Sequence, residues 1–366
     1  MIYADHNATA PLRGEVREAM LPWLDRVGNP ASVHRAGQTA RMAVERAREQ
    51  VAALIGGNST GVVFTSGATE ANHTALLGAW QLAGRPGVVA SPIEHPCVQA
   101  CLSGLEARGA RVERWAVGAD GVVLVRPISP DVGVVSLMAA NHETGVIQPI
   151  ERAWEEARSI GAFLHVDATQ AAGRIPLQLS DADAVVLSSH KLGGPGGVGA
   201  LVLRNGDPFP PLLRGGAQER GRRSGTVNIA GVVGFGEACR VALRELDRES
   251  EHVRGLSEQL WAGLRQFGAR RIGCPDRRLP NTTTVVFPGL LGESLVQALD
   301  IAGVCVSSGA ACASGSVEPS PVLVAMGDPE PAGGVRFSLG RTNTAADIDA
   351  ILSIVPGVLE SVRWAQ

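Results

Sequence analysis

The stretch that decides the fold covers residues 163–204 and reads FLHVDATQAAGRIPLQLSDADAVVLSSHKLGGPGGVGALVLR. This stretch contains three short apolar runs that have the length and composition of strands. They are Ala162–Ala168, which begins one residue earlier, Ala184–Ser188 and Ala200–Arg204. Polar or glycine-rich segments follow the first two runs. In parallel sheets, ligands bind beyond the carboxyl ends of the strands. We therefore expect the chemistry of this chain to lie just after these runs.

The same alternation extends toward the N-terminus. Six further segments continue it, three strand-like and three helical: Val62–Thr65, Gly87–Ser91 and Val132–Ala140, then Glu70–Leu82, Pro96–Arg108 and Ile150–Ile160. Strands separated by helices of this length indicate right-handed crossovers and a mostly parallel sheet. The sequence thus predicts an α/β fold.

The C-terminal third predicts a second, smaller α/β domain. The expected elements are helices from Asn228 to about Leu246, at Glu249–Phe267, near Glu293–Leu299 and from about Ala345, and strands at Thr282–Phe287 and Val335–Leu339. A chain of 366 residues fits two domains, because one domain takes about 150 residues. We expect a large domain of residues 15–242 and a small domain formed by residues 1–14 and 243–366.

Composition and charge exclude several classes of protein. A net charge of -3 and a pI near 6.3 exclude a basic nucleic-acid footprint over the whole chain. No apolar run reaches the roughly 18 residues that a membrane span needs, and no signal-peptide pattern opens the sequence. The 6 cysteines form no C-x-x-C pair, so neither a disulfide framework nor a metal site is indicated. We expect a cytoplasmic protein.

The basic residues are distributed unusually. Of 33 basic residues, 32 are arginines and only Lys191 is a lysine. This lysine is either a chance remnant of an arginine bias or a position where arginine cannot serve. Lysine, unlike arginine, can lose its proton and form a Schiff base.

Two motifs overlap Lys191, and neither fits its context. The glycines of residues 194–199 satisfy G-x-G-x-x-G, but they lead into the strand-like Ala200–Arg204 instead of opening a helix. Ser188 and Lys191 satisfy S-x-x-K, but the partner motif K-T-G would need a second lysine. What remains is a lysine at a strand end beside hydroxyl and imidazole groups. Pyridoxal phosphate (PLP) fits such a position, because its aldehyde can form a Schiff base with the lysine and its phosphate group can bind the neighbouring hydroxyl and imidazole groups.

A PLP site makes demands elsewhere in the chain. The ring nitrogen needs a carboxylate that keeps it protonated, and Asp167 ends an apolar strand. Gln170, three residues later, could reach the phenolic oxygen of the ring. Alternatively, Asp167 only caps the next helix.

The phosphate and the ring face need partners too. The segment FTSGATEAN, residues 64–72, follows a strand and precedes a helix, and its Gly67, Ala68 and Thr69 offer N–H and hydroxyl groups to a phosphate. The alternative is an ordinary helix start. His95 follows another strand and could stack on the ring, although a lone histidine is more often structural.

Two C-terminal residues suggest a substrate chemistry. Cys312 lies in Val306–Ser316, a run of small residues without apolar periodicity that predicts an exposed loop, and its thiol is a candidate nucleophile. Arg336 could bind a substrate carboxylate through its planar fork, or else form an ordinary ion pair.

Taken together, these motifs resemble the cysteine desulfurases, PLP enzymes of the class-V aminotransferase family, and within them the branch with the longer cysteine loop. The matching segments are residues 4–11, 28–34, 65–72, 94–96, 141–145, 165–170, 188–191, 218–226, 307–314, 318–320 and 336–341. The resemblance implies PLP fold type I, with a large domain built on a mostly parallel, seven-stranded-type sheet, a smaller α/β domain and a homodimeric assembly.

The resemblance also implies roles for individual residues. They are Lys191 as the lysine that binds the cofactor covalently, Asp167 as the ring-nitrogen partner, Gln170 and Asn141 near the phenolic oxygen and the substrate, His95 as the stacking, proton-handling histidine, Ala68, Thr69, Ser188 and His190 around the phosphate, Thr226 as a ligand offered to the neighbouring subunit, Arg336 as the carboxylate ligand and Cys312 as the persulfide-forming cysteine.

The implied reaction removes sulfur from L-cysteine, leaving L-alanine and a persulfide on Cys312. An iron–sulfur scaffold or a tRNA-thiolation protein would then accept the sulfur. Two alternatives on the same fold are an aminotransferase and a selenocysteine lyase. A third is a non-catalytic accessory of sulfur relay, which purified protein lacking yellow colour would support.

Overall fold

The computed structural model describes residues 1–309, 312–313 and 316–365, with side chains for residues 1–309 and 318–363. Its main sheet has the strand order β2-β8-β7-β6-β5-β3-β4. The strands are β2 (Val62–Thr65), β3 (Gly87–Ala90), β4 (Arg111–Arg114), β5 (Val132–Ser136), β6 (Phe163–Asp167), β7 (Ala184–Ser188) and β8 (Gly199–Leu203). Neighbouring strands are parallel except where β8 pairs with β2 and β7. The predicted mostly parallel sheet is therefore confirmed.

The sequence does not predict β4. This edge strand reads RVER and is mostly exposed, so it carries neither an apolar run nor an apolar alternation. Its main-chain pairing with β3 holds it in the sheet.

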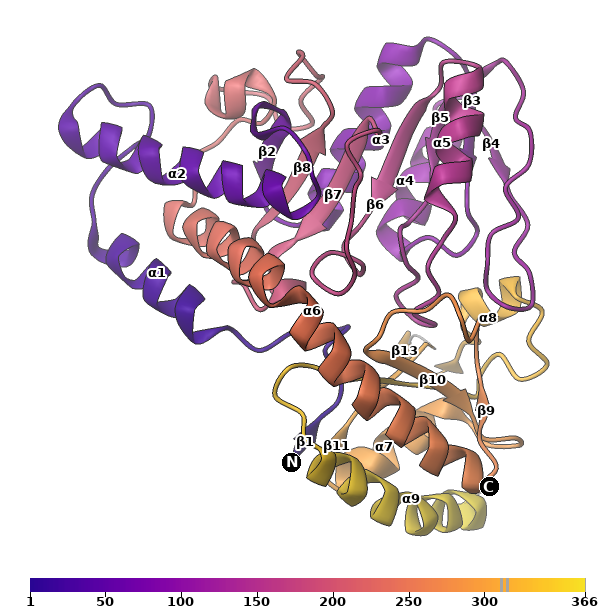
Figure 1. The fold of residues 1–366 in the computed structure, drawn as a ribbon. Helices are drawn as coiled ribbons and strands as arrows, with labels where there is room; N and C mark the ends of the chain where they lie inside the picture. Colours follow the sequence, from indigo (N-terminus) through magenta and orange to yellow (C-terminus); the bar gives the residue numbers. More distant parts are fainter. Residues whose placement is uncertain (310–311, 314–315, 366) are drawn as a thin grey trace.

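Helices cover both faces of the main sheet (Figure 1). Buried side chains of α3 (Ala68–Ala83) and α4 (Pro96–Glu106) pack on one face. Side chains of α2 (Arg35–Leu54), α5 (Ile150–Ser159) and the first half of α6 (Ile229–Gln266) pack on the other face, and α1 (Gly14–Asp25) lies against α6. Two-sided burial explains why the central strands read as continuous apolar runs.

The small domain is an antiparallel sheet with its own apolar core. Its strand order is β12-β15-β10-β9, and the helices α7 and α9 pack on it. The elements are β9 (Arg270–Arg271), β10 (Thr282–Val286), β12 (Ser307–Ser308), β15 (Gly334–Ser338), α7 (Gly292–Ile301), α8 (Pro321–Ala325) and α9 (Ala345–Ala365). The N-terminal β1 (Ile2–Tyr3) returns to this domain and pairs in parallel with β11 (Val304–Cys305).

One long helix joins the two domains. The two helices expected at 228–246 and 249–267 are a single helix, α6 (Ile229–Gln266), so the predicted break is wrong. The intervening residues, LDRE, contain no glycine or proline to interrupt a helix. Buried residues up to Ala242 join the core of the large domain, and those from Leu256 join the core of the small domain. The division at residues 242–243 falls within α6 and remains a prediction.

Both ends of the described chain lie on the small-domain side of the molecule (Figure 1). None of the helices in the described part of the chain is long and apolar enough to cross a membrane.

Candidate active site

A cavity of about 290 Å³ lies beyond the carboxyl ends of the parallel strands, where the sequence predicts the site. Nine of the predicted residues line it: Gly67, Ala68, Thr69, His95, Asp167, Gln170, Ser188, His190 and Lys191. They come from segments far apart in sequence that the parallel strands bring to one edge of the sheet.

Lys191 lies in a short 3₁₀ turn directly after β7, between the cavity and the N-terminal arm (residues 2–10). Its Nζ donates hydrogen bonds to the main-chain carbonyls of Asn7 and Ala8, the latter at 2.8 Å. Burial lowers the pKa of the amine to about 8, and the positive charges of Arg174 and Arg336 act in the same direction. A lysine with a lowered pKa is partly neutral near physiological pH, as attack on an aldehyde requires.

Asp167, at the end of β6, is held by donors on both carboxylate oxygens. Oδ1 accepts a hydrogen bond from the main-chain N–H of Thr169 at 2.9 Å, and Oδ2 accepts one from Nδ2 of Asn72 at 2.8 Å. The bond to Thr169 lies within a turn, and no helix begins between β6 and β7, so the alternative that Asp167 caps a helix is wrong. Its role toward a cofactor stays a prediction.

A buried hydrogen-bond chain continues behind Asp167. Asn72 donates to Asp167 through Nδ2, so its Oδ1 faces His165 Nε2 at 2.8 Å and must accept a hydrogen bond from it. Nδ1 of His165 then accepts from Ser136 Oγ at 2.9 Å. Burial lowers the pKa of His165 to about 4, so the ring is neutral with its proton on Nε2.

The turn before α3 also lines the cavity. First-turn N–H groups of a helix have no partner within the helix, and here they belong to Ala68 and Thr69, which line the cavity. A Cβ on Gly199 would lie 2.6 Å from the backbone of Gly67, so β8 passes this turn only because residue 199 is glycine. Hydroxyl and imidazole groups of Ser188 and His190 line the cavity as well.

His95 caps α4 while it lines the cavity. Its Nδ1 accepts the main-chain N–H of Cys97 at 3.2 Å, which leaves the proton of the neutral ring on Nε2. Burial lowers the pKa of His95. The ring of His142 meets the ring of His95 edge-on, with 5.2 Å between the ring centres. The Nδ1 of His142 is buried and has no partner in the described part of the protein.

These groups fit pyridoxal phosphate. The cavity combines helix-start N–H groups and hydroxyls, a carboxylate with fixed donors, and an amine of lowered pKa. The buried hydroxyl of Thr169, which also lines the cavity, has no partner among the described residues. A flat ligand with a phosphate, a basic ring nitrogen and an aldehyde would engage each of them.

Three predicted residues, Asn141, Thr226 and Arg336, do not line the cavity. The amide of Asn141 is used internally: it donates to the carbonyl of Ile93 and accepts from the N–H of Glu143. Thr226 is exposed before α6. The backbone of Cys312 belongs to β13 (Cys312–Ala313), which pairs with β14 (Ser316–Val317), but its side chain lies outside the described residues. Arg336, in β15, reaches the edge of the cavity through a hydrogen bond to the carbonyl of His142.

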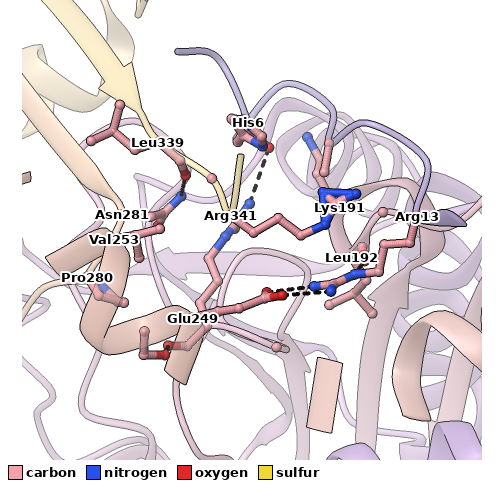
Figure 2. Close-up of a pocket in the computed structure, with 16 residues that line it drawn as sticks. His6, Arg13, Lys191, Leu192, Glu249, Val253, Pro280, Asn281, Leu339 and Arg341 are labelled. Atoms are coloured by element: carbon pink, nitrogen blue, oxygen red, sulfur yellow. Dashed lines mark hydrogen bonds and ion pairs between the residues drawn. The ribbon is translucent and has the colours of Figure 1, made fainter. Parts of the chain in front are cut away.

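The N-terminal arm is the largest feature that sequence reasoning did not place at the site. Besides holding Lys191, its Asn7 carbonyl accepts a hydrogen bond from Gln170, and Asp5 pairs with Arg336. Lys191 also borders a second cavity of about 60 Å³, which Figure 2 shows together with the arm residue His6. There the paired side chains of Arg13 and Glu249 connect the start of α1 to α6.

The pattern of the aminotransferase class-V family matches residues 2–351. The chain belongs to the class-V aminotransferase family. Among curated relatives of this class-V chain, a cysteine desulfurase of Cereibacter sphaeroides is 45% identical over 99% of this chain and 96% of its own length. A cysteine desulfurase NifS of Azotobacter vinelandii is 40% identical over 99% of this chain and 93% of its own length. A solved structure described as a NifS-like protein superposes with a TM-score of 0.92 at 35% identity, covering 98% of this chain and 99% of that one.

Proposed function

We propose that this chain is a PLP-dependent cysteine desulfurase that converts L-cysteine to L-alanine and carries the sulfur as a persulfide on Cys312. The observation that carries the proposal is the juxtaposition, in one cavity, of the only lysine of the chain with a doubly hydrogen-bonded aspartate and a helix-start turn. The names of the curated relatives point to the same activity.

When bound, PLP supplies an aldehyde that takes the substrate amine and a protonated ring that accepts electrons from the substrate. Asp167 would keep the ring nitrogen protonated. The amine of Lys191 would act as the base toward the α-proton of the substrate. His95 would face the ring and exchange protons through Nε2. Arg336 would bind the substrate carboxylate. The thiolate of Cys312 would attack the substrate sulfur, so that an S–S bond forms as the Cβ–S bond breaks, and the electron pair left on Cβ would take up a proton to give the methyl group of alanine.

The assembly and the sulfur acceptor are part of the proposal. Thr226 is exposed on its own chain, as a residue offered to the cavity of a second copy would be. We therefore propose a homodimer in which Thr226 reaches the neighbouring phosphate site. The persulfide sulfur would pass to an iron–sulfur scaffold or to a tRNA-thiolation protein.

The test is to incubate the purified protein with PLP, L-cysteine and a reductant, and to measure alanine, sulfide and pyruvate. Equal amounts of alanine and sulfide are expected, and Cys312→Ala should abolish sulfide release while Cys274→Ala should not. 3-Mercaptopyruvate in place of alanine would indicate transamination, and pyruvate formed together with sulfide and ammonia would indicate β-elimination; either would reject the proposed function. Alanine formed only from selenocysteine would indicate a selenocysteine lyase. A colourless protein that makes no alanine would support the accessory role.

A further inference from the structure

The arm residue Asp5 contacts the arginine that the proposed function assigns to the substrate carboxylate. Its Oδ1 accepts a hydrogen bond from Arg336 Nη2 at 2.7 Å, and the two groups form an ion pair. The pair is shielded from water, with side-chain exposures of 16% for Asp5 and 9% for Arg336. Asp5 thus offers Arg336 the same chemical group that an amino-acid substrate would offer.

The remaining donors of Arg336 show how a second carboxylate can approach. Nη1 donates to the carbonyl of His142 at 2.8 Å, a main-chain contact next to the cavity wall. Nε is buried and has no partner in the described part of the protein. A guanidinium binds carboxylates in pairs of parallel N–H···O bonds, so the edge formed by Nε and Nη2 is only half used by Asp5.

The charges around Arg336 favour an exchange of one anion for another. Lys191 and Arg174 lie close enough to interact electrostatically with it. A buried arginine among other cations needs an anion, because an uncompensated buried charge is costly. Asp5 supplies that anion when no substrate is bound.

We propose that Asp5 is the resting counter-ion of Arg336, and that it competes with the α-carboxylate of the substrate for the Nε–Nη2 edge. The inference rests on the proposed function of Arg336. The incoming carboxylate binds the free Nε and displaces Asp5 from Nη2. Asp5 therefore weakens carboxylate binding and prevents Arg336 from being left as an unpaired buried cation.

The test compares two ligands on the PLP-loaded enzyme at one pH. L-Alanine carries the carboxylate, and L-alaninamide lacks it. Binding of each is followed by the change in the visible absorption of the cofactor. In Asp5→Asn the amide still accepts a hydrogen bond from Arg336 but carries no charge. L-Alanine should bind this variant at least about five-fold more tightly than it binds the unmodified enzyme. The reason is that a charged acceptor makes a hydrogen bond roughly twice as strong as a neutral one, so the amide is displaced more easily than the carboxylate. The affinity for L-alaninamide should change less than about two-fold.

Controls separate this role from a structural one. Asp300→Asn removes an exposed carboxylate in α7 and should change neither affinity. Arg336→Gln should weaken L-alanine binding, and adding Asp5→Asn to it should bring no gain. Unchanged or weaker L-alanine binding in Asp5→Asn, with an unchanged melting temperature, would overturn the proposal. Desulfuration by the unmodified enzyme in that case would leave the proposed function standing, whereas its absence would reject the function itself.

Discussion

At the scale of single residues, the decisive feature is the environment of Lys191. The amine lies among cations and main-chain carbonyls, and burial contributes most to its lowered pKa. A pKa of about 8 leaves about one tenth of the amine neutral at pH 7, far more than for an ordinary lysine with a pKa near 10.4.

This predicts the pH dependence of cofactor capture. The rate at which the apoprotein takes up PLP, followed by absorbance, should rise with pH and level off just above pH 8, because only the neutral amine attacks the aldehyde. Arg174→Gln removes a positive charge that lowers the pKa, so its profile should shift to higher pH. A rate that continues to rise above pH 10, as for a free lysine, would contradict the prediction.

Most residues at the cavity could be predicted because they follow strands. Asp167, Ser188 and Lys191 lie at strand ends, and strand ends of a parallel sheet converge. His165 could have been found in the same way, because residues two apart on a strand share a face with Asp167. The arm could not be found, since it forms only the two-residue strand β1 and acts mainly through main-chain carbonyls.

At the scale of elements, three neighbouring elements share one hydrogen-bond chain. Asn72 of α3 joins Asp167 and His165 of β6, and His165 joins Ser136 of β5. All four side chains are buried. Buried polar chains of this kind stabilise a fold only while every member has its partner.

Breaking the chain at Asn72 should therefore be costly. In Asn72→Ala, one oxygen of Asp167 and Nε2 of His165 lose their partners, and the free energy of unfolding should fall by about 2–4 kcal/mol. Urea denaturation of the apoprotein measures this. The exposed Asn205→Ala is the matched control, with an expected loss of under about 0.5 kcal/mol. His165→Gln keeps a donor toward Asn72 and should lose less than Asn72→Ala; an equal or larger loss would argue against the assigned proton on Nε2.

At the scale of the whole molecule, the fold consists of two apolar cores joined by α6 and by the returning arm. The sequence predicts both cores from their apolar patterns. It does not predict that one helix serves both, because an amphipathic pattern shows which face is buried and not what lies against it.

The ion pair of Arg13 and Glu249 connects the start of α1 to α6. Two hydrogen bonds of 2.7 and 2.6 Å connect the guanidinium to the carboxylate, and the side chains are 9% and 18% exposed. Glu249→Gln should lower the free energy of unfolding by roughly 1–3 kcal/mol, because a buried arginine loses its counter-ion. Glu251→Gln, an exposed neighbour on α6, should have little effect in the same denaturation experiment. Equal losses for the two variants would show that the pair contributes nothing specific.

The continuity of α6 constrains how the enzyme can open. A helix of 38 residues extends about 57 Å at 1.5 Å per residue. Its middle part, Glu237–Arg254, contains no glycine or proline at which it could kink. Swinging one core away from the other would require bending this rod. Substrate entry is therefore expected to need only local rearrangements near the cavity, with no large rotation of one core against the other.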